Sequence, residues 1–165
     1  MNGEVLLLTA ALLLTAFSAA EAADCTERPA PGVDWQRCSL DRRDLADHNL
    51  KKALLSDASF ERADLSAADL SDVQATHAKF ISAILHNAKL DGGNFAEADF
   101  TKADLSGASL KNADLRRTHL FRANLRGADL SGARTQGADM LNADLSGARW
   151  TDGRVCAAGS TGQCD

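Results

Sequence analysis

The chain has 165 residues, of which 45% are hydrophobic, and a formal net charge of −5. It contains no strongly basic domain, and this excludes the charge signature of a nucleic-acid-binding protein. The abundance of Ala, Leu, Lys and Arg is typical of helical proteins, but the spacing of the large apolar residues is not.

Residues 1–22 have the pattern of a secretory signal peptide. An apolar stretch over residues 5–20 ends in Ala20-Glu21-Ala22, which predicts cleavage after Ala22. The stretch is short for a membrane span, which needs roughly 20 residues. Because residues 1–4 contain no Lys or Arg, an uncleaved anchor stays the alternative. We expect an exported protein, periplasmic or extracellular, with no stable membrane span after cleavage and with 21 acidic against 18 basic residues, net −3.

Residues 23–37 contain Pro29, Pro31 and Gly32 and precede a long repeat domain. The end of a stacked repeat domain exposes unpaired backbone and apolar interior, so it needs a cap. We predict that residues 23–37 are a non-repeat cap, with Trp35 as a candidate plug over the first turn of the repeats.

Residues 38–155 carry a large apolar residue at every fifth position. These positions run from Leu40 to Val155, and of the 24 slots only Ala75 and Thr135 are not large and apolar. Alanine stands two residues before the slot in 17 of the 24 units. A spacing of five excludes an α-helix, in which successive slots drift by about 140° around the axis. It also excludes a straight strand, in which successive slots alternate between faces.

A chain that bends by about a right angle every five residues keeps all slots inside. Four such segments close a square coil of 20 residues, and the 24 segments make about six coils, stacked at roughly 4.8 Å to a length of about 29 Å. Slots taken every 20 residues agree with this coil, because one column brings three phenylalanines together: Leu40, Phe60, Phe80, Phe100, Leu120 and Met140. In another column the small Ala75 neighbours the large Phe95, as a packed core requires.

Three units illustrate the sequence pattern: Ala63-Asp64-Leu65-Ser66, Ala103-Asp104-Leu105-Ser106-Gly107 and Ala143-Asp144-Leu145-Ser146-Gly147. They resemble the A-(D/N)-L-x-x units of pentapeptide-repeat proteins, and the resemblance covers about 118 of the 165 residues. It implies an all-β fold, the right-handed quadrilateral β-helix, in which the slot residue and the small residue two before it point inward. The resemblance also implies one role to consider, in which long acidic faces imitate DNA and act on DNA gyrase.

Residues 156–165 form a Gly- and Ser-rich tail, which we expect a disulfide to hold against the last coil, where Trp150 closes the core. The four cysteines fit an oxidising compartment and allow three pairings. Cys25 with Cys38, and Cys156 with Cys164, close short loops at the two ends. The other pairings have to span about 29 Å unless the tails fold back. A zinc site is the alternative, but no C-x-x-C is present.

One outer corner of the coil combines apolar residues with a basic stripe. The residues are Ile81, Ile84, Phe121, Leu141, Arg62, Lys102 and Arg122. We hypothesise a binding face for an unknown protein partner with an apolar, partly acidic surface, or for self-association. The alternative is that a few exposed apolar residues are normal on any protein.

No catalytic, cofactor-binding or metal site is predicted. The chain lacks G-x-S-x-G, H-E-x-x-H and a Gly-rich phosphate loop. A column of alternating charge could hold a weak metal, but such ladders are more often exposed ion pairs; its members are Asp57, His77, Glu97 and Arg117.

We therefore expect a non-catalytic, secreted or periplasmic protein that acts as a rigid protein-binding or structural scaffold module. The alternative is a DNA-mimic regulator of a nucleic-acid enzyme such as DNA gyrase, acting through the column Asp44, Asp64, Asp104 and Asp144. Near-neutral charge after cleavage, the interruption of that column by Ile84, and export argue against this alternative.

Overall fold

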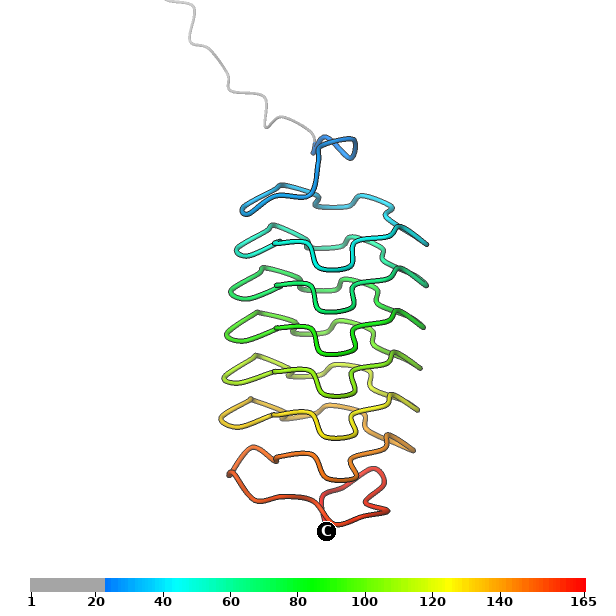
Figure 1. Ribbon diagram of the computed structural model, residues 1–165, viewed down its shortest axis with the longest axis vertical. Coiled ribbons are helices and arrows are strands. Elements are labelled where there is room, and N and C mark those ends of the chain that lie inside the picture. Colours follow the sequence, from blue (N-terminus) through cyan, green and yellow to red (C-terminus); the bar gives the residue numbers. More distant parts are fainter. Residues whose placement is uncertain (1–22) are drawn as a thin grey trace, which may run out of the picture.

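The chain winds into a stack of four-cornered coils around one long axis (Figure 1). The computed structural model describes residues 23–165, and the predicted signal peptide, residues 1–22, lies outside the described residues. Within the described range, single bridge residues recur at every fifth position from Asp34 to Arg149, with tight turns between them and no helix. Each parallel bridge joins residues twenty apart, such as Asp44 and Asp64. The coil therefore has four sides of five residues, as the spacing predicts.

No helix in the described part of the chain has the length and hydropathy needed to cross a membrane.

Each corner is a β-turn with a left-handed third residue. In the turn from Leu40 to Arg43, the amide of Arg43 donates to the carbonyl of Leu40 at 3.3 Å, and Arg42 has φ 57°. A positive φ at this position is the mark of a type II turn, which favours glycine or asparagine. Most corners nevertheless use other residues. The ladder of the stacked coils holds these turns in place.

The coils are joined by backbone hydrogen bonds along the axis. The amide of Leu40 donates to Ser59 O at 2.7 Å, and the amide of Arg42 donates to Glu61 O at 2.9 Å. In the opposite direction, the amide of Ser59 donates to Cys38 O at 2.8 Å. The same three bonds recur in the successive units, so each coil is fixed to the next on all four sides.

The slot residues and the small residues before them fill the interior without a gap for solvent. Phe60, Phe80 and Phe100 stack in one column, with ring centroids 5.1 and 4.8 Å apart, and Phe95 contacts this stack edge-on. All four are fully buried. Thr118 takes an alanine position inside the core, and its hydroxyl donates to the carbonyl of Leu115 at 2.8 Å, which satisfies the buried oxygen.

The repeat register begins before residue 38, the expected start. Trp35 occupies an inward slot and is fully buried, Val33 stands two residues before it, and Asp34 bridges to Leu54. Trp35 is thus part of the first coil and not a plug above it. The guanidinium of Arg43 lies 5.8 Å from the centre of its ring.

The expectation that Val155 is the last inward slot is wrong. The chain reverses after Trp150, whose amide donates to Arg154 O at 2.7 Å, and Val155 then forms an antiparallel bridge with Arg149. Its side chain is 57% exposed. Because the reversal ends the five-residue winding, the last slot of the parallel coil is Trp150, which packs against the core but is only partly buried.

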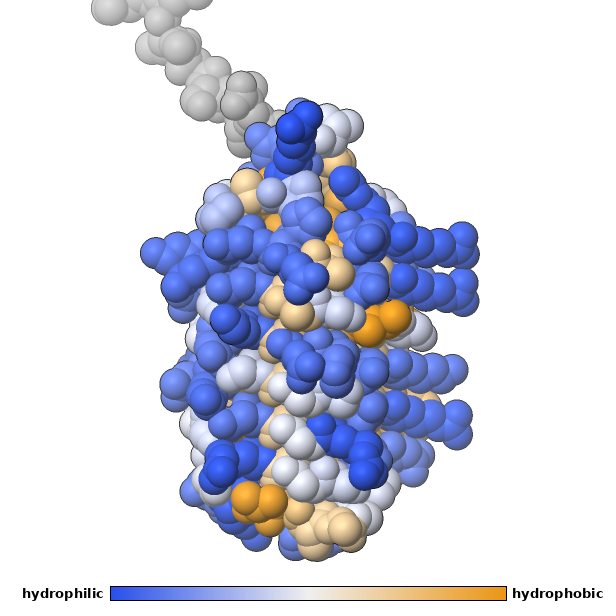
Figure 2. Space-filling view, viewed as in Figure 1, coloured by the Kyte–Doolittle hydropathy of each residue, from blue (hydrophilic) through white to orange (hydrophobic). Residues whose placement is uncertain are grey.

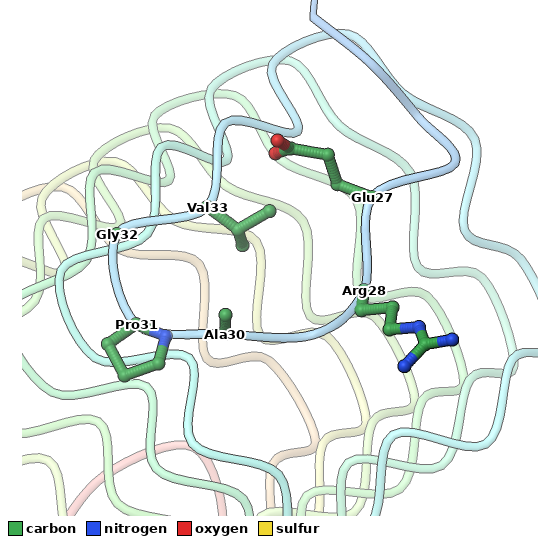
Figure 3. A pocket seen from close by; sticks show the side chains of 6 residues that line it. All are labelled: Glu27, Arg28, Ala30, Pro31, Gly32 and Val33. Atoms are coloured by element: carbon green, nitrogen blue, oxygen red, sulfur yellow. The ribbon is translucent and has the colours of Figure 1, made fainter.

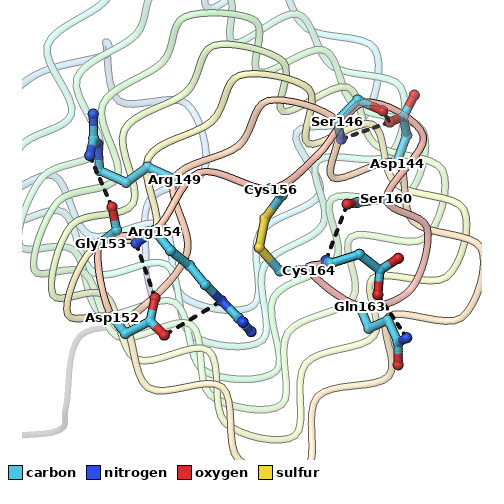
Figure 4. The surroundings of a disulfide bond; sticks show 11 residues. Asp144, Ser146, Arg149, Asp152, Gly153, Arg154, Cys156, Ser160, Gln163 and Cys164 are labelled. Atoms are coloured by element: carbon cyan, nitrogen blue, oxygen red, sulfur yellow. Dashed lines mark hydrogen bonds and ion pairs between the residues drawn. A yellow bond between two sulfur atoms is a disulfide. The ribbon is translucent and has the colours of Figure 1, made fainter.

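The structure contains both expected disulfides. Cys25–Cys38 attaches the segment before the first coil, and Cys156–Cys164 closes a loop in the tail (Figure 4). The tail runs antiparallel to the last coil, and the amides of Leu145 and Gly147 donate to the carbonyls of Ser160 and Cys156. The tail therefore covers one side of the coil that ends the stack.

Candidate functional site

The interior is packed with buried Leu, Phe and Ala side chains, so the candidate sites lie on the outside. The described surface carries several hollows. The one at the N-terminal end has a volume of about 280 Å³ and is lined by Glu27, Arg28, Ala30, Pro31, Gly32 and Val33. Figure 3 shows the Arg28 side chain pointing away from the centre of this hollow. Its polar groups do not converge on one point, unlike those of a substrate site.

The seven residues of the predicted corner lie along one edge of the stack, and we call them the corner face. Leu141 is 61% exposed and Ile84 is 43% exposed, while Ile81 and Phe121 are half-buried. Ile81 and Ile84 flank a single turn, and Phe121 follows two coils later, about 10 Å along the axis. The apolar residues therefore form two spots and not a continuous patch. On the side shown in Figure 2, hydrophobic surface likewise occurs as small separate spots among hydrophilic side chains.

The basic residues of the corner face have no acidic partner. Arg62, Lys102 and Arg122 are exposed, and none has a carboxylate of residues 23–165 within ion-pair distance. The guanidinium of Arg122 instead lies 5.1 Å from the ring centre of Phe121, a cation–π arrangement. Some basic residues elsewhere are paired, for example Lys111 with Asp129 at 3.5 Å. The corner face thus presents positive charge that no side chain of the described chain neutralises.

The carboxylates beside the corner face are engaged by neighbouring backbone and side chains. Asp64 accepts the amide of Ser66 at 2.9 Å, and hydrogen bonds from Ser66 hold the pKa of Asp64 below its ordinary value. Asp104 accepts the Ser106 amide at 3.0 Å and the Asn124 side chain at 2.9 Å. These bonds direct the carboxylates along the wall.

The column that could hold a metal is an exposed row of ion pairs. Nε2 of His77 lies 3.2 Å from Oε2 of Glu97, Nδ1 of His77 lies 3.9 Å from Asp57, and Arg117 approaches Glu97 at 3.4 Å. At least 44% of each of these side chains is exposed. Within residues 23–165 no three His, Cys, Asp or Glu residues are arranged to hold a metal ion.

Sequence analysis missed one buried carboxylate. The side chain of Asp114 is only 6% exposed, and it accepts Nε and Nη2 of Arg116 at 2.8 and 2.7 Å and Nη2 of Arg134 at 2.7 Å. The hydrogen bond from Arg116 is the main cause that holds the pKa of Asp114 below its ordinary value, and the charge of Arg134 adds to it. Stacking the sequence by twenty puts Arg134 next to Asp114, so the signal was present. The cluster joins two coils.

The comparison with family models decides the family. The model for pentapeptide repeats, with eight copies, matches residues 36–72, 44–81, 58–95, 78–117 and 123–149. The chain belongs to the pentapeptide repeat family. Pentapeptide repeat proteins fold as right-handed quadrilateral β-helices, which agrees with the four-sided coils described above.

Solved pentapeptide repeat structures resemble the chain. HetL, a pentapeptide repeat protein involved in heterocyst differentiation regulation in Nostoc sp. strain PCC 7120, is 35% identical over 75% of this chain and 64% of its own, with a TM-score of 0.48. Rfr23 of Cyanothece 51142 is 24% identical over 71% of this chain and 90% of its own, with a TM-score of 0.46. QnrB1, a plasmid-mediated fluoroquinolone resistance protein, is 21% identical over 73% and 70%, with a TM-score of 0.47.

This pentapeptide repeat chain therefore spans just under two thirds of the length of HetL. The comparison with curated proteins returns no match.

Proposed function

We propose that the protein is an exported, non-catalytic binding module that presents the corner face to another protein. The observation that carries this proposal is the combination of exposed Ile84 and Leu141 with three cations that have no ion-pair partner within residues 23–165, on coils joined by backbone hydrogen bonds. Arginine and aromatic residues are enriched at protein interfaces, and a preordered surface loses little entropy on binding. The partner that fits is a protein surface with apolar side chains and carboxylates.

Export is part of the proposal. Two disulfides fit an oxidising compartment, and the apolar stretch of residues 5–20 supplies a signal. Mass spectrometry of the natively expressed protein tests this directly. We expect an N-terminus at Ala23 and two intact disulfides. An intact, reduced chain would contradict export and would favour the DNA-mimic alternative.

The binding face is tested by affinity capture from the native host with matched variants. Leu141→Ser and Arg122→Glu should lose the specific partner. Leu54→Ser and Lys89→Glu are the controls, because Leu54 is also an exposed apolar residue and Lys89 an exposed unpaired lysine, both outside the corner face. Equal capture by the face variants and the controls would rule out the corner face.

Self-association through the same face is tested by sedimentation of the purified protein. If the protein is a dimer and Leu141→Ser dissociates it, the corner face binds a second copy of the chain. A dimer that survives this substitution uses another surface, and a monomer directs the search to a different protein.

A further inference from the structure

One side of the last coil carries backbone groups that no other part of the described chain pairs. We call it the free wall, and it consists of residues 137–142. Within residues 23–165, the amides of Gly137, Met140 and Asn142 have no hydrogen-bond partner, and the carbonyl of Ala138 accepts no hydrogen bond. An unpaired row of this kind is the edge of a β-ladder, to which another strand can add.

The matching side one coil earlier shows what this edge lacks. There, the amides of Arg117, Leu120 and Arg122 all donate to the following coil, at 3.1, 2.7 and 3.0 Å. The carbonyl of Thr118 accepts the amide of Asp139 at 2.9 Å. The free wall has the same shape but no coil beyond it, so its groups keep the spacing of a parallel ladder.

The adjoining side of the same coil already accepts an added strand. The protein's own tail pairs there, and it ends its pairing where the amide of Gly162 donates to Ala143 O at 2.9 Å. A Cβ on Gly162 would lie 3.4 Å from the carbonyl oxygen of Met140 and 3.8 Å from the amide nitrogen of Asn142, so the tail lies against the Asn142 end of the free wall (the tail is seen around the disulfide in Figure 4). The tail shows that the edge of this coil is competent for strand pairing.

We propose that the free wall binds an extended segment of a partner protein as an additional parallel strand. One residue of that segment lies opposite Asp139; its amide donates to Ala138 O, and its carbonyl accepts the amide of Met140. This is strand addition to an exposed edge, in which the backbone supplies affinity and alternate side chains supply specificity. Leu141 belongs to both the free wall and the corner face, but the backbone pairing does not use its side chain.

The side chains of the free wall define the segment's chemistry. Gly137 lies directly below Arg117, since a Cβ on Gly137 would be 3.4 Å from Cγ of Arg117, and the Arg117 side chain is 76% exposed. Arg117 ends the column of alternating charge that begins at Asp57. An acidic residue opposite Gly137 would continue this alternation. Asp139 is exposed without a cation partner, so it favours a basic residue opposite it.

The remaining positions of the segment are apolar. Met140 points inward and is 8% exposed, and Leu141 points outward and is 61% exposed. A small residue fits opposite Ala138, because the side chains of that column enter the narrow core. The expected segment therefore reads acidic, small, basic, apolar, apolar, as in Glu-Ala-Lys-Leu-Leu.

A fusion tests the proposal without knowledge of the partner. The segment Glu-Ala-Lys-Leu-Leu is appended after Asp165 through a flexible Gly/Ser linker of about twelve residues, which reaches roughly 19 Å and keeps the segment at a high effective concentration. Amide hydrogen exchange is then followed by NMR with both disulfides intact. We expect the amide of Met140 to exchange about tenfold more slowly than in the unextended chain, because it donates to the carbonyl of the residue opposite Asp139.

The matched control replaces the lysine of the segment with proline, which has no amide to donate to Ala138 O. This extension should leave the Met140 amide as fast as in the unextended chain. Equal protection of that amide by both extensions, or by neither, overturns the proposal. Concentration-dependent protection of the Met140 amide in the unextended chain also overturns it, because a second copy would then occupy the wall. Unchanged exchange at Leu120 and Arg122 verifies that every variant is folded.

Discussion

Arg134 lies one full coil after Asp114, and its Nη2 donates to Oδ2 of that carboxylate at 2.7 Å. Arg116 binds the same carboxylate from its own coil. Because the carboxylate is nearly buried, these donors replace its water. We predict that Asp114→Asn lowers the free energy of unfolding by about 1–3 kcal/mol, measured by chemical denaturation at pH 7. Asp139→Asn is the control, since Asp139 is exposed and unpaired within residues 23–165, and its effect should stay within about 0.5 kcal/mol.

The same carboxylate predicts a pH dependence. The folded-state pKa of Asp114 lies below its ordinary value, so its contribution to stability is present above pH 4 and is lost as the pH falls through the folded pKa. The difference in stability between the wild type and Asp114→Asn should therefore shrink as the pH falls below about 4. A difference that stays constant at every lower pH at which the protein is folded would show that the charge of Asp114 contributes nothing.

The phenylalanine stack predicts that one core position is strongly sensitive to substitution. Phe80 lies between Phe60 and Phe100 and also contacts Phe95, so its removal leaves a cavity lined by three rings. Phe80→Ala should cost about 3–5 kcal/mol in thermal or chemical unfolding. Leu141→Ala on the outside should cost less than about 0.5 kcal/mol. Similar losses for the two variants would contradict the inward packing of the slots.

Two glycines with the same backbone conformation predict different responses to alanine. Gly107 and Gly127 have φ of 67° and 65°. A Cβ at Gly107 would lie 2.4 Å from Oδ1 of Asn87, whereas nothing lies within 4 Å of a Cβ at Gly127. Gly127→Ala should cost about 1 kcal/mol for backbone strain alone, and Gly107→Ala should cost more. Adding Asn87→Ala should remove the excess, and a double variant as unstable as Gly107→Ala would disprove the contact.

The C-terminal disulfide predicts a local effect. Replacing Cys156 and Cys164 by serine opens a loop of eight-residue separation, and the loss of about 2–3 kcal/mol should fall on the tail. Amide exchange at Leu145 and Gly147 should rise, because both donate to tail carbonyls. Exchange at Leu65 and Phe80 should not change. Uniform acceleration throughout the chain would show instead that the tail holds the whole stack together.

The repeat spacing predicts the interior almost completely, because a residue such as Leu65 has the same neighbours one coil above and below as any other slot residue. The ends are different. Trp35 falls on the five-residue spacing, but the prolines before it suggested a cap, and Val155 also falls on the spacing although the chain has already reversed. The five-residue spacing alone does not show at which residue the first coil begins or the last coil ends.

The outer surface was only partly predictable. Stacking by twenty places Phe121 beside Leu141 and Arg134 beside Asp114, but it does not say which charges meet. The ion pair of Arg134 with Asp114 depends on side-chain directions, which the stacking does not give. The free wall consists of backbone groups without hydrogen-bond partners in the described chain. Which groups lack a partner depends on the path of the tail, and the sequence does not give that path.

The bridge period of twenty residues has a consequence for how the molecule can change in length. Deleting five residues leaves every leucine inside but rotates all that follows by a quarter turn, so Leu141 would leave the edge that holds Ile84. Deleting or duplicating twenty residues changes the height and preserves each outer edge. The protein can therefore gain or lose whole coils without moving any residue to another edge. Gaining or losing part of a coil turns every outer side chain after that point to a different edge.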